Sequence, residues 1–210
     1  MAKLYFRHGT VSSAKTLNLL AVFHNYGQQG KNAILIKPAT DDRFGAETVQ
    51  SRAGLSVKAN YVLPTNGSLP INALDHVDCV LVDEVQFFSS AFIESLRRIT
   101  HIYNIPVICY GLRTDYKTHA FEGALRLFEL ADSIEEIKTT CAYCDKKAIF
   151  NLKLKGDTAV VDGPQVELGL EDKYLPTCAH CYSIKVSQSQ TQQTSQEAIE
   201  SSTPLTEAFA

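Results

Sequence analysis

The sequence has no tryptophan, a single methionine and no apolar run long enough to cross a membrane. A membrane-spanning helix needs about 20 apolar residues in a row, whereas the longest apolar runs here, such as 79–82 and 105–112, have the length of strands. Charge of one sign is not in excess either, because 20 Lys and Arg face 23 Asp and Glu, for a net charge of −3. Dedicated nucleic-acid binders usually carry a basic excess, so neither nucleic acid nor a membrane is expected as a partner.

The N-terminus lacks the apolar region and the small-residue cleavage site of a secretory signal. We therefore expect a cytoplasmic protein. In that reducing compartment the six cysteines are expected to be thiols or metal ligands and not disulfides. A length of 210 residues with 45% apolar residues fits one ordinary domain with a small appendage.

Apolar runs of strand length alternate with helical patterns over the first part of the chain. Strands are predicted at 4–6, 33–36, 79–82 and 105–110, and helices at 15–26, 89–103 and 121–130. Such alternation is typical of a parallel sheet covered by helices on both faces. We therefore predict an α/β fold with a nucleotide-binding core over 1–140, in which 41–75 form loops and short elements.

Two further segments follow the predicted core. Residues 141–185 contain two Cys-x-x-Cys pairs and are predicted to form a small zinc-binding domain. Residues 186–210 are rich in Ser, Thr and Gln. They have too few apolar residues to offset the entropy lost on ordering, so we predict a disordered polar tail.

The first motif that carries chemistry lies between the first strand and the first helix. It matches the phosphate-binding loop G-x-x-x-x-G-K-[ST], except that alanine replaces the second glycine. Its residues are Gly9, Thr10, Val11, Ser12, Ser13, Ala14, Lys15 and Thr16. Backbone N–H groups would bind phosphate oxygens, Lys15 would reach the β- and γ-phosphates, and Thr16 would bind Mg²⁺. The alternative is a serine-rich turn that caps an ordinary helix.

An acidic pair, Asp83-Glu84, follows the apolar run at 79–82. Four apolar residues and then an acid are typical of the strand whose carboxylate organises Mg²⁺ in nucleotide-binding proteins. The carboxyl ends of parallel strands meet at one edge of a sheet, so this pair is expected near the phosphate loop. Glu84 would then be free to act as a general base. The alternative is a solvated acidic pair.

Four cysteines form the third pattern, and they are Cys141, Cys144, Cys178 and Cys181. Two Cys-x-x-Cys pairs at this spacing are typical of a structural zinc site with four thiolate ligands. The long segment between the pairs leaves room for a loop with a role of its own. Free thiols are the alternative.

Over about residues 3–183 the chain resembles the thymidine kinase family of the cytosolic, zinc-containing type. The resemblance rests on the phosphate loop, both cysteine pairs and five further fragments in the same order. These fragments are Asp41–Phe44, Val82–Phe87, Tyr110–Asp115, Phe121–Gly123 and Glu171–Tyr174. The resemblance implies a RecA-like core and a zinc-held lasso loop. It also implies transfer of the ATP γ-phosphate to the 5′-hydroxyl of thymidine, or of deoxyuridine, in nucleoside salvage for DNA synthesis.

The resemblance further implies cofactors and site residues: ATP as co-substrate, Mg²⁺, structural Zn²⁺ and a homotetramer. Glu84 would be the catalytic base. ATP would also be bound by Asp41, Asp42, Arg43, Asp83, Glu84, Val85 and Gln86. The nucleoside would be bound by Tyr116, Gln165, Val166, Glu167, Leu168, Gly169 and Tyr174.

Three positions depart from the family pattern. Ala14 replaces a glycine, Val11 replaces a methionine near the thymine methyl group, and Leu170 replaces a lasso glycine. Ala14 and Leu170 favour an alternative, a kinase-fold nucleotide-binding protein with impaired catalysis. A zinc-ribbon ATPase that acts on nucleic acid is a third interpretation, which the net charge of −3 and the acidic run at 132–136 disfavour. The nucleoside kinase is the leading interpretation.

Overall fold

The computed structural model describes residues 1–165 and 173–201, and its largest element is a six-stranded parallel sheet in the order β5-β2-β6-β7-β1-β8. The strands are β1 (Leu4–His8), β2 (Ala33–Pro38), β5 (Tyr61–Leu63), β6 (Cys79–Val82), β7 (Val107–Gly111) and β8 (Ser133–Glu136). The pairings along this order are all parallel. The central strands are apolar throughout because both faces of the sheet are covered.

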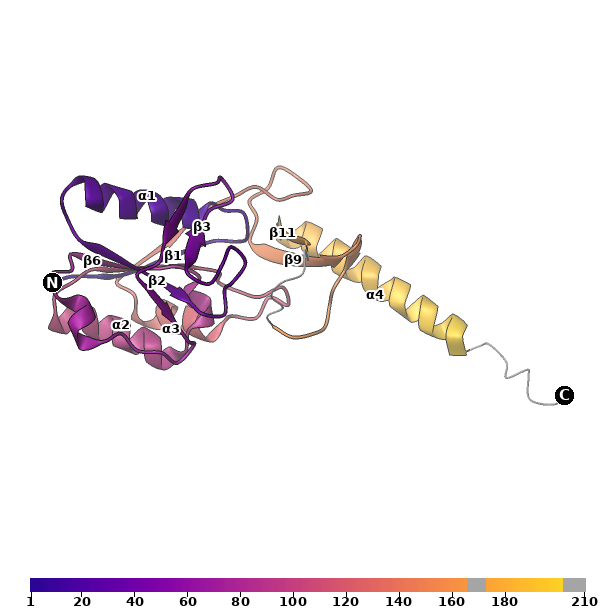
Figure 1. The fold of residues 1–210 in the computed structure, drawn as a ribbon. Helices are drawn as coiled ribbons and strands as arrows, with labels where there is room; N and C mark the ends of the chain where they lie inside the picture. Colours follow the sequence, from indigo (N-terminus) through magenta and orange to yellow (C-terminus); the bar gives the residue numbers. More distant parts are fainter. Residues whose placement is uncertain (166–172, 202–210) are drawn as a thin grey trace.

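Helices cover the two faces of this sheet. Helix α1 (Lys15–Gln28) lies on one face, and α2 (Ser90–Ile102) and α3 (Glu122–Leu130) lie on the other, as Figure 1 shows. Successive side chains of a strand point to opposite faces, so Leu81 packs in the cluster of α1 while Val80 packs in that of α2 and α3. This arrangement confirms the predicted α/β sheet.

The edges of the sheet were harder to predict. Edge strand β5 and the hairpin of β3 (Thr48–Gln50) and β4 (Ser56–Lys58) lie in the segment expected to hold loops and short elements. The opposite edge, β8, is the acidic run at 132–136. An edge strand pairs on one side only, so backbone hydrogen bonds can hold a polar sequence there. Two short 3₁₀ helices, η1 (Ile71–Leu74) and η2 (Val85–Phe87), complete the core.

A second, antiparallel sheet follows the core in the order β10-β9-β11. It consists of β9 (Phe150–Lys155), β10 (Thr158–Ala159) and β11 (Lys173–Thr177). Helix α4 (Ala179–Ser201) packs on it through Tyr182 and Val186, which contact a small apolar cluster around Leu152 and Leu154. Figure 1 shows α4 extending away from the parallel sheet.

Helix α4 overlaps the segment that was predicted to be a disordered tail. Disorder was predicted from 186 onward, but the structure continues the helix through Ser201. The middle of the helix is anchored where Ser189 Oγ accepts a hydrogen bond from the Ala159 N–H and donates one to the Lys185 carbonyl. No proline or glycine interrupts 179–201, so the helix can propagate from this anchor. Residues 202–210 lie outside the described residues. No helix in the described part of the chain combines the length and apolarity needed to span a bilayer.

Candidate functional site

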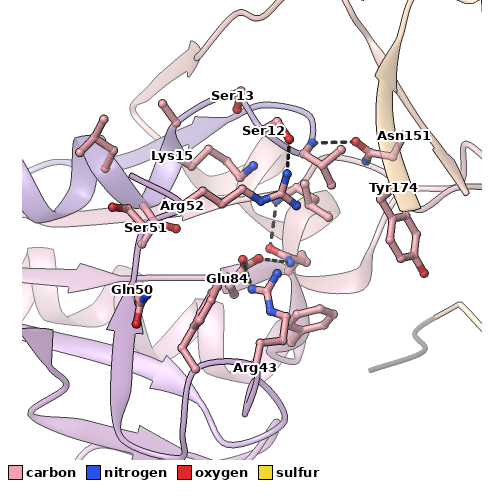
Figure 2. Close-up of a pocket in the computed structure, with 18 of the residues that line it drawn as sticks. Ser12, Ser13, Lys15, Arg43, Gln50, Ser51, Arg52, Glu84, Asn151 and Tyr174 are labelled. Carbon is pink, nitrogen blue, oxygen red and sulfur yellow. Dashed lines mark hydrogen bonds and ion pairs between the residues drawn. The ribbon is translucent and has the colours of Figure 1, made fainter. Parts of the chain in front are cut away.

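The carboxyl ends of the parallel strands open into a cavity of about 890 Å³. The phosphate loop follows β1, and Asp83 and Glu84 follow β6, so the topology brings the two predicted motifs together. The cavity is lined by most of the phosphate loop (Val11–Thr16), by Arg43, Glu84 and Gln86, and by Tyr116, Gln165 and Tyr174 from farther along the chain. Figure 2 shows these side chains converging from several elements.

The phosphate loop has the backbone that a cradle for an anion needs. A Cβ on Gly9 would lie 2.4 Å from Ser13 Oγ and 2.5 Å from the Ile137 carbonyl oxygen, so only glycine fits there. Ser12 and Ala14 have positive φ angles of 60° and 64°. Ala14 immediately precedes α1 and is left-handed, the conformation for which glycine is preferred. Ala14 therefore has the backbone conformation expected of the glycine that it replaces, although it carries an additional methyl group.

Lys15 is buried, with 8% of its surface exposed, and its Nζ donates a hydrogen bond of 2.7 Å to the Thr10 carbonyl. Burial lowers the pKa of Lys15, the Glu84 and Asp83 charges oppose that shift, and the Arg43 and Arg52 charges add to it. The Thr16 hydroxyl lies 3.3 Å from Asp83 Oδ2. A hydroxyl and a carboxylate oxygen thus converge beside the lysine, and such hard oxygen donors suit Mg²⁺.

The pKa values of the two neighbouring acids are shifted in opposite directions. Burial raises the pKa of Asp83 to about 7, and the Glu84 charge acts in the same direction. Burial alone would also raise the pKa of Glu84, but the charges of Arg43 and Lys15 hold it below its ordinary value. Glu84 is therefore the carboxylate that stays ionised at neutral pH.

Hydrogen bonds fix the Glu84 carboxylate on both oxygens. Arg43 Nη2 lies 2.5 Å from Oε1, and Gln86 Nε2 donates to Oε2 at 2.7 Å. Gln86 is itself held, because its Oε1 accepts the Leu112 N–H at 2.9 Å. A Cβ on Gly111 would lie 2.5 Å from that oxygen, so glycine is required there for Gln86 to fit. Glu84 has a φ of 44°, an unusual backbone for a glutamate.

The structure distinguishes among the predicted ATP-binding residues. Arg43 lines the cavity, and its Nε also pairs with Asp41 Oδ1 at 2.6 Å. Asp41 is buried behind that arginine, and Asp42 is exposed. The Val85 side chain is fully buried in the core beneath α2 and α3, so only its backbone could face a ligand.

The predicted nucleoside residues come from two parts of the chain. Tyr116 and Tyr174 line the cavity together with Gln165, whose Nε2 donates to Asp115 Oδ2 at 3.1 Å. Lys117 Nζ donates to the Gly163 carbonyl at 2.8 Å and so joins the segment before the lasso to the core. The other lasso residues, Val166, Glu167, Leu168 and Gly169, and Leu170 after them, lie outside the described residues.

Several cavity residues carry no recognisable sequence signal. Asn151 on β9 accepts the Val11 N–H at 2.8 Å and donates to the Thr114 carbonyl at 2.9 Å, so it connects the phosphate loop to the second sheet. Gln50, Ser51 and Arg52 reach the cavity from the β3–β4 hairpin. No motif marks these four residues, because only the fold brings them near the loop.

The four predicted cysteines come together at the edge of the second sheet. Their sulfur atoms all lie within 4.8 Å of one another, and Cys144 Sγ is 3.6 Å from Cys178 Sγ and 3.7 Å from Cys181 Sγ. Tetrahedral zinc with Zn–S bonds of 2.3 Å would separate its sulfur ligands by about 3.8 Å. The N–H groups of Tyr143 and Cys181 point at Cys141 Sγ and Cys178 Sγ. The cluster can hold a metal ion.

Comparisons with known proteins agree with this site. The family model described as thymidine kinase matches residues 2–182. A thymidine kinase of Lactobacillus johnsonii is 40% identical over 192 residues, which cover 87% of this chain and 96% of the relative. Those of Chromobacterium violaceum and Streptococcus pyogenes serotype M3 are 41% and 38% identical, again over 87% of this chain, and over 98% and 97% of the relatives. The chain belongs to the thymidine kinase family.

Proposed function

We propose that this chain transfers the γ-phosphate of ATP to the 5′-hydroxyl of thymidine, with Glu84 as general base. The observation that carries the proposal is that Glu84 and Lys15 line one cavity together with a phosphate loop and two tyrosines. Membership of the thymidine kinase family makes the chain an ATP-dependent nucleoside kinase, a transferase with thymidine and ATP as substrates. The alternative of a kinase fold with impaired catalysis is not favoured by these relationships.

The phosphate end of the reaction relies on positioning and charge. The N–H groups at residues 12–16 of the loop would bind the phosphate oxygens, and Lys15 would move from the Thr10 carbonyl to the transferring phosphate. Thr16 and Asp83 would hold Mg²⁺, which supplies charge neutralisation at the phosphates when bound. Asp83 at a pKa of about 7 would release its proton readily beside a divalent cation.

Glu84 has the protonation state that a general base needs. It is ionised, because Arg43 and Lys15 lower its pKa. A carboxylate has about four acceptor positions, of which Arg43 and Gln86 occupy one on each oxygen. An acceptor position therefore remains for the 5′-hydroxyl. The hydroxyl oxygen attacks the γ-phosphorus, the bond to the β-phosphate oxygen breaks, and Glu84 takes the hydroxyl proton.

The second sheet would hold the nucleoside. Tyr116 and Tyr174 offer aromatic surface for the base, and Gln165 with the lasso residues 166–169 would supply polar contacts to thymine. Structural Zn²⁺ on Cys141, Cys144, Cys178 and Cys181 would fix the two ends of the segment that carries the lasso. A fixed loop loses less entropy on binding. We thus assign ATP binding to the core at 1–140, and nucleoside binding to the zinc-binding lasso domain at 141–185 together with Tyr116 of the core.

Two properties of the whole protein belong to the same proposal. We propose that the chain acts in the cytoplasm, where thiolates remain reduced and available to zinc. We also propose a homotetramer, as the family resemblance implies. Size-exclusion chromatography with light scattering would measure the assembly, and a monomer would refute it.

The test of the mechanism is Glu84→Gln, which keeps the shape of the side chain but cannot accept a proton. We expect turnover at saturating substrates to fall by about 10²–10⁴-fold, the usual range for a general base. Calorimetry should show ATP and thymidine binding close to wild type. The control is Glu129→Gln, an exposed carboxylate on α3, which should keep full turnover. A fall of less than about tenfold for Glu84→Gln would contradict the assignment.

A further inference from the structure

The β3–β4 hairpin presents one arginine to the phosphate loop. The guanidinium of Arg52 donates from Nη1 to Ser12 Oγ in that loop, although the two residues are far apart in sequence. Arg52 lines the same cavity as Lys15, and it is near enough for its charge to lower the pKa of that lysine. Figure 2 shows its side chain pointing from the hairpin toward the loop.

The hairpin that carries Arg52 is firmly attached to the core. Val49 on β3 is buried in the apolar cluster beneath α1. The buried Lys37 donates its Nζ to the carbonyls of Gly45 and Thr48 and so fastens the chain that leads into β3. The position of Arg52 is therefore fixed by the core, while its side chain remains exposed.

The turn itself is closed by backbone hydrogen bonds. The Ser51 N–H donates to the Leu55 carbonyl at 2.8 Å, and the Gly54 N–H donates to the Ser51 carbonyl at 3.0 Å. Gly54 has a φ of 90°, which allows the chain to reverse within these few residues. Arg52 thus stands on an ordered turn.

Arg52 differs from Arg43 in the charge that faces it. Arg43 forms ion pairs with both Asp41 and Glu84, so two carboxylates already neutralise it. Within 1–165 and 173–201 no carboxylate lies within ion-pair distance of Arg52. Among the described residues, its polar contact is with a neutral hydroxyl of the phosphate loop. Most of the N–H donors of Arg52 are therefore available to bind an anion that the phosphate loop would hold.

We propose that Arg52 binds the polyphosphate of ATP from the hairpin side of the cavity. This inference rests on the proposed function, which places ATP at Gly9–Thr16. Arg52 would exchange the Ser12 hydroxyl for phosphate oxygens, which accept charge-assisted hydrogen bonds that are stronger than bonds to a neutral hydroxyl. Arg43 would remain with Glu84 and orient the base.

The experiment compares Arg52→Ala and Arg52→Lys with Lys58→Ala. Lys58 is on the same hairpin but pairs with Glu47 at the surface, so its removal changes the net charge equally without touching the cavity. Titration calorimetry would measure the binding of ATP, ADP and thymidine. We expect Arg52→Ala to weaken the binding of ATP by about tenfold or more, and the binding of ADP by less. The ATP affinity of Arg52→Lys should lie between those of wild type and Arg52→Ala, because lysine keeps the positive charge but lacks the planar guanidinium group that can form two parallel hydrogen bonds. Lys58→Ala and thymidine binding should not change.

Two outcomes would overturn the inference. One is that the ATP affinity of Arg52→Ala stays within about twofold of the wild-type affinity. The other is an equal loss of ATP affinity and thymidine affinity in Arg52→Ala, which would mean that Arg52 only supports the fold. Lys15→Ala separates these results from a failure of the proposed function. If Lys15→Ala loses ATP binding while Arg52→Ala keeps it, only the role of Arg52 is refuted. If Lys15→Ala also keeps ATP binding, the phosphate loop is not the ATP site.

Discussion

At the scale of single residues, the site depends on backbone conformations that side chains do not favour. Glu84 and Ala14 both have positive φ angles and both line the cavity. Such conformations persist only where surrounding contacts impose them, and they are common at functional sites. At Glu84, hydrogen bonds from Gln86 and Arg43 hold the carboxylate in place. Ala14 adopts its positive φ within the phosphate loop, and its methyl group makes that conformation less favourable than it would be for glycine.

Replacing Ala14 by glycine should therefore stabilise the protein. A left-handed conformation costs a residue with a Cβ roughly 1–2 kcal/mol, whereas the greater freedom of glycine in the unfolded chain costs about 0.4–1 kcal/mol. The net expectation is a gain of about 0.5–1 kcal/mol in the free energy of unfolding, with ATP affinity equal or higher. Urea unfolding and ATP calorimetry would measure both.

A matched substitution on the same helix should have the opposite effect. Ala21 is exposed in the middle of α1, so Ala21→Gly should destabilise the protein by about 1 kcal/mol. If Ala14→Gly lowers stability as much as Ala21→Gly does, the left-handed conformation at position 14 is not strained. A clear loss of ATP affinity in Ala14→Gly would show that the loop depends on the methyl group.

At the scale of elements, polar contacts attach the edge of the sheet to the helix below it. Asp132 directly precedes β8, and its Oδ2 accepts the Leu4 N–H of β1 at 2.8 Å. The same carboxylate pairs with Arg97 of α2. One side chain thus connects the first strand, the edge strand and a helix. The phosphate loop follows β1, so this attachment helps to fix the loop.

The Asp132 contacts predict a dependence of stability on pH. The Arg97 hydrogen bond lowers the pKa of Asp132, partial burial opposes this shift, and the Leu4 N–H adds to it. A carboxyl whose pKa is lower in the folded state stabilises the protein above its unfolded pKa of about 3.9 and loses that effect as pH falls through the folded pKa. Asp132→Asn should reduce the free energy of unfolding at pH 7 by about 1 kcal/mol, since the pair is partly exposed.

The difference between wild type and Asp132→Asn should shrink as the pH falls below about 4, because the carboxyl group is then protonated in the unfolded chain. It should vanish once the pH is below the folded pKa of Asp132, where both side chains are neutral. Urea unfolding at pH 7, 5 and 3 would follow it. Asp157→Asn is the control, because Asp157 lies in an exposed turn between β9 and β10 and should show little difference at any pH. A constant difference for Asp132→Asn from pH 7 to pH 3 would contradict the ionic origin.

At the scale of the whole molecule, the site lies between two sheets of different character. The parallel sheet supplies Lys15 and Glu84 from its strand ends, and the antiparallel sheet supplies Asn151 and Tyr174. The second sheet is small, and its apolar cluster has few members. A small core of this kind usually needs a metal or another cross-link for stability, and the four cysteines offer one.

The purified protein should therefore hold about one zinc ion per chain. Elemental analysis would measure it, and Cys141→Ser should lower the content. Removal of the metal with a chelator should weaken thymidine binding and expose β9–β11 to hydrogen exchange, while the parallel sheet and ATP binding change less. Metal-free protein with full activity and unchanged exchange would show that the cysteines do not form a structural zinc site.

The sequence by itself determined the features that are local. The central strands of the sheet are continuous apolar runs, and their alternation with helices predicts a parallel sheet. The phosphate loop, Asp83-Glu84 and the cysteine pairs were found because neighbouring residues carry their chemistry. Only the tertiary structure decided which residues join them. Arg52 and Asn151 reach the phosphate loop from separate elements, and Arg43 reaches Glu84 across 41 residues of sequence. Edge strand β8 also forms on contact with a distant strand, because a polar sequence becomes ordered in a sheet only where a neighbour satisfies its backbone.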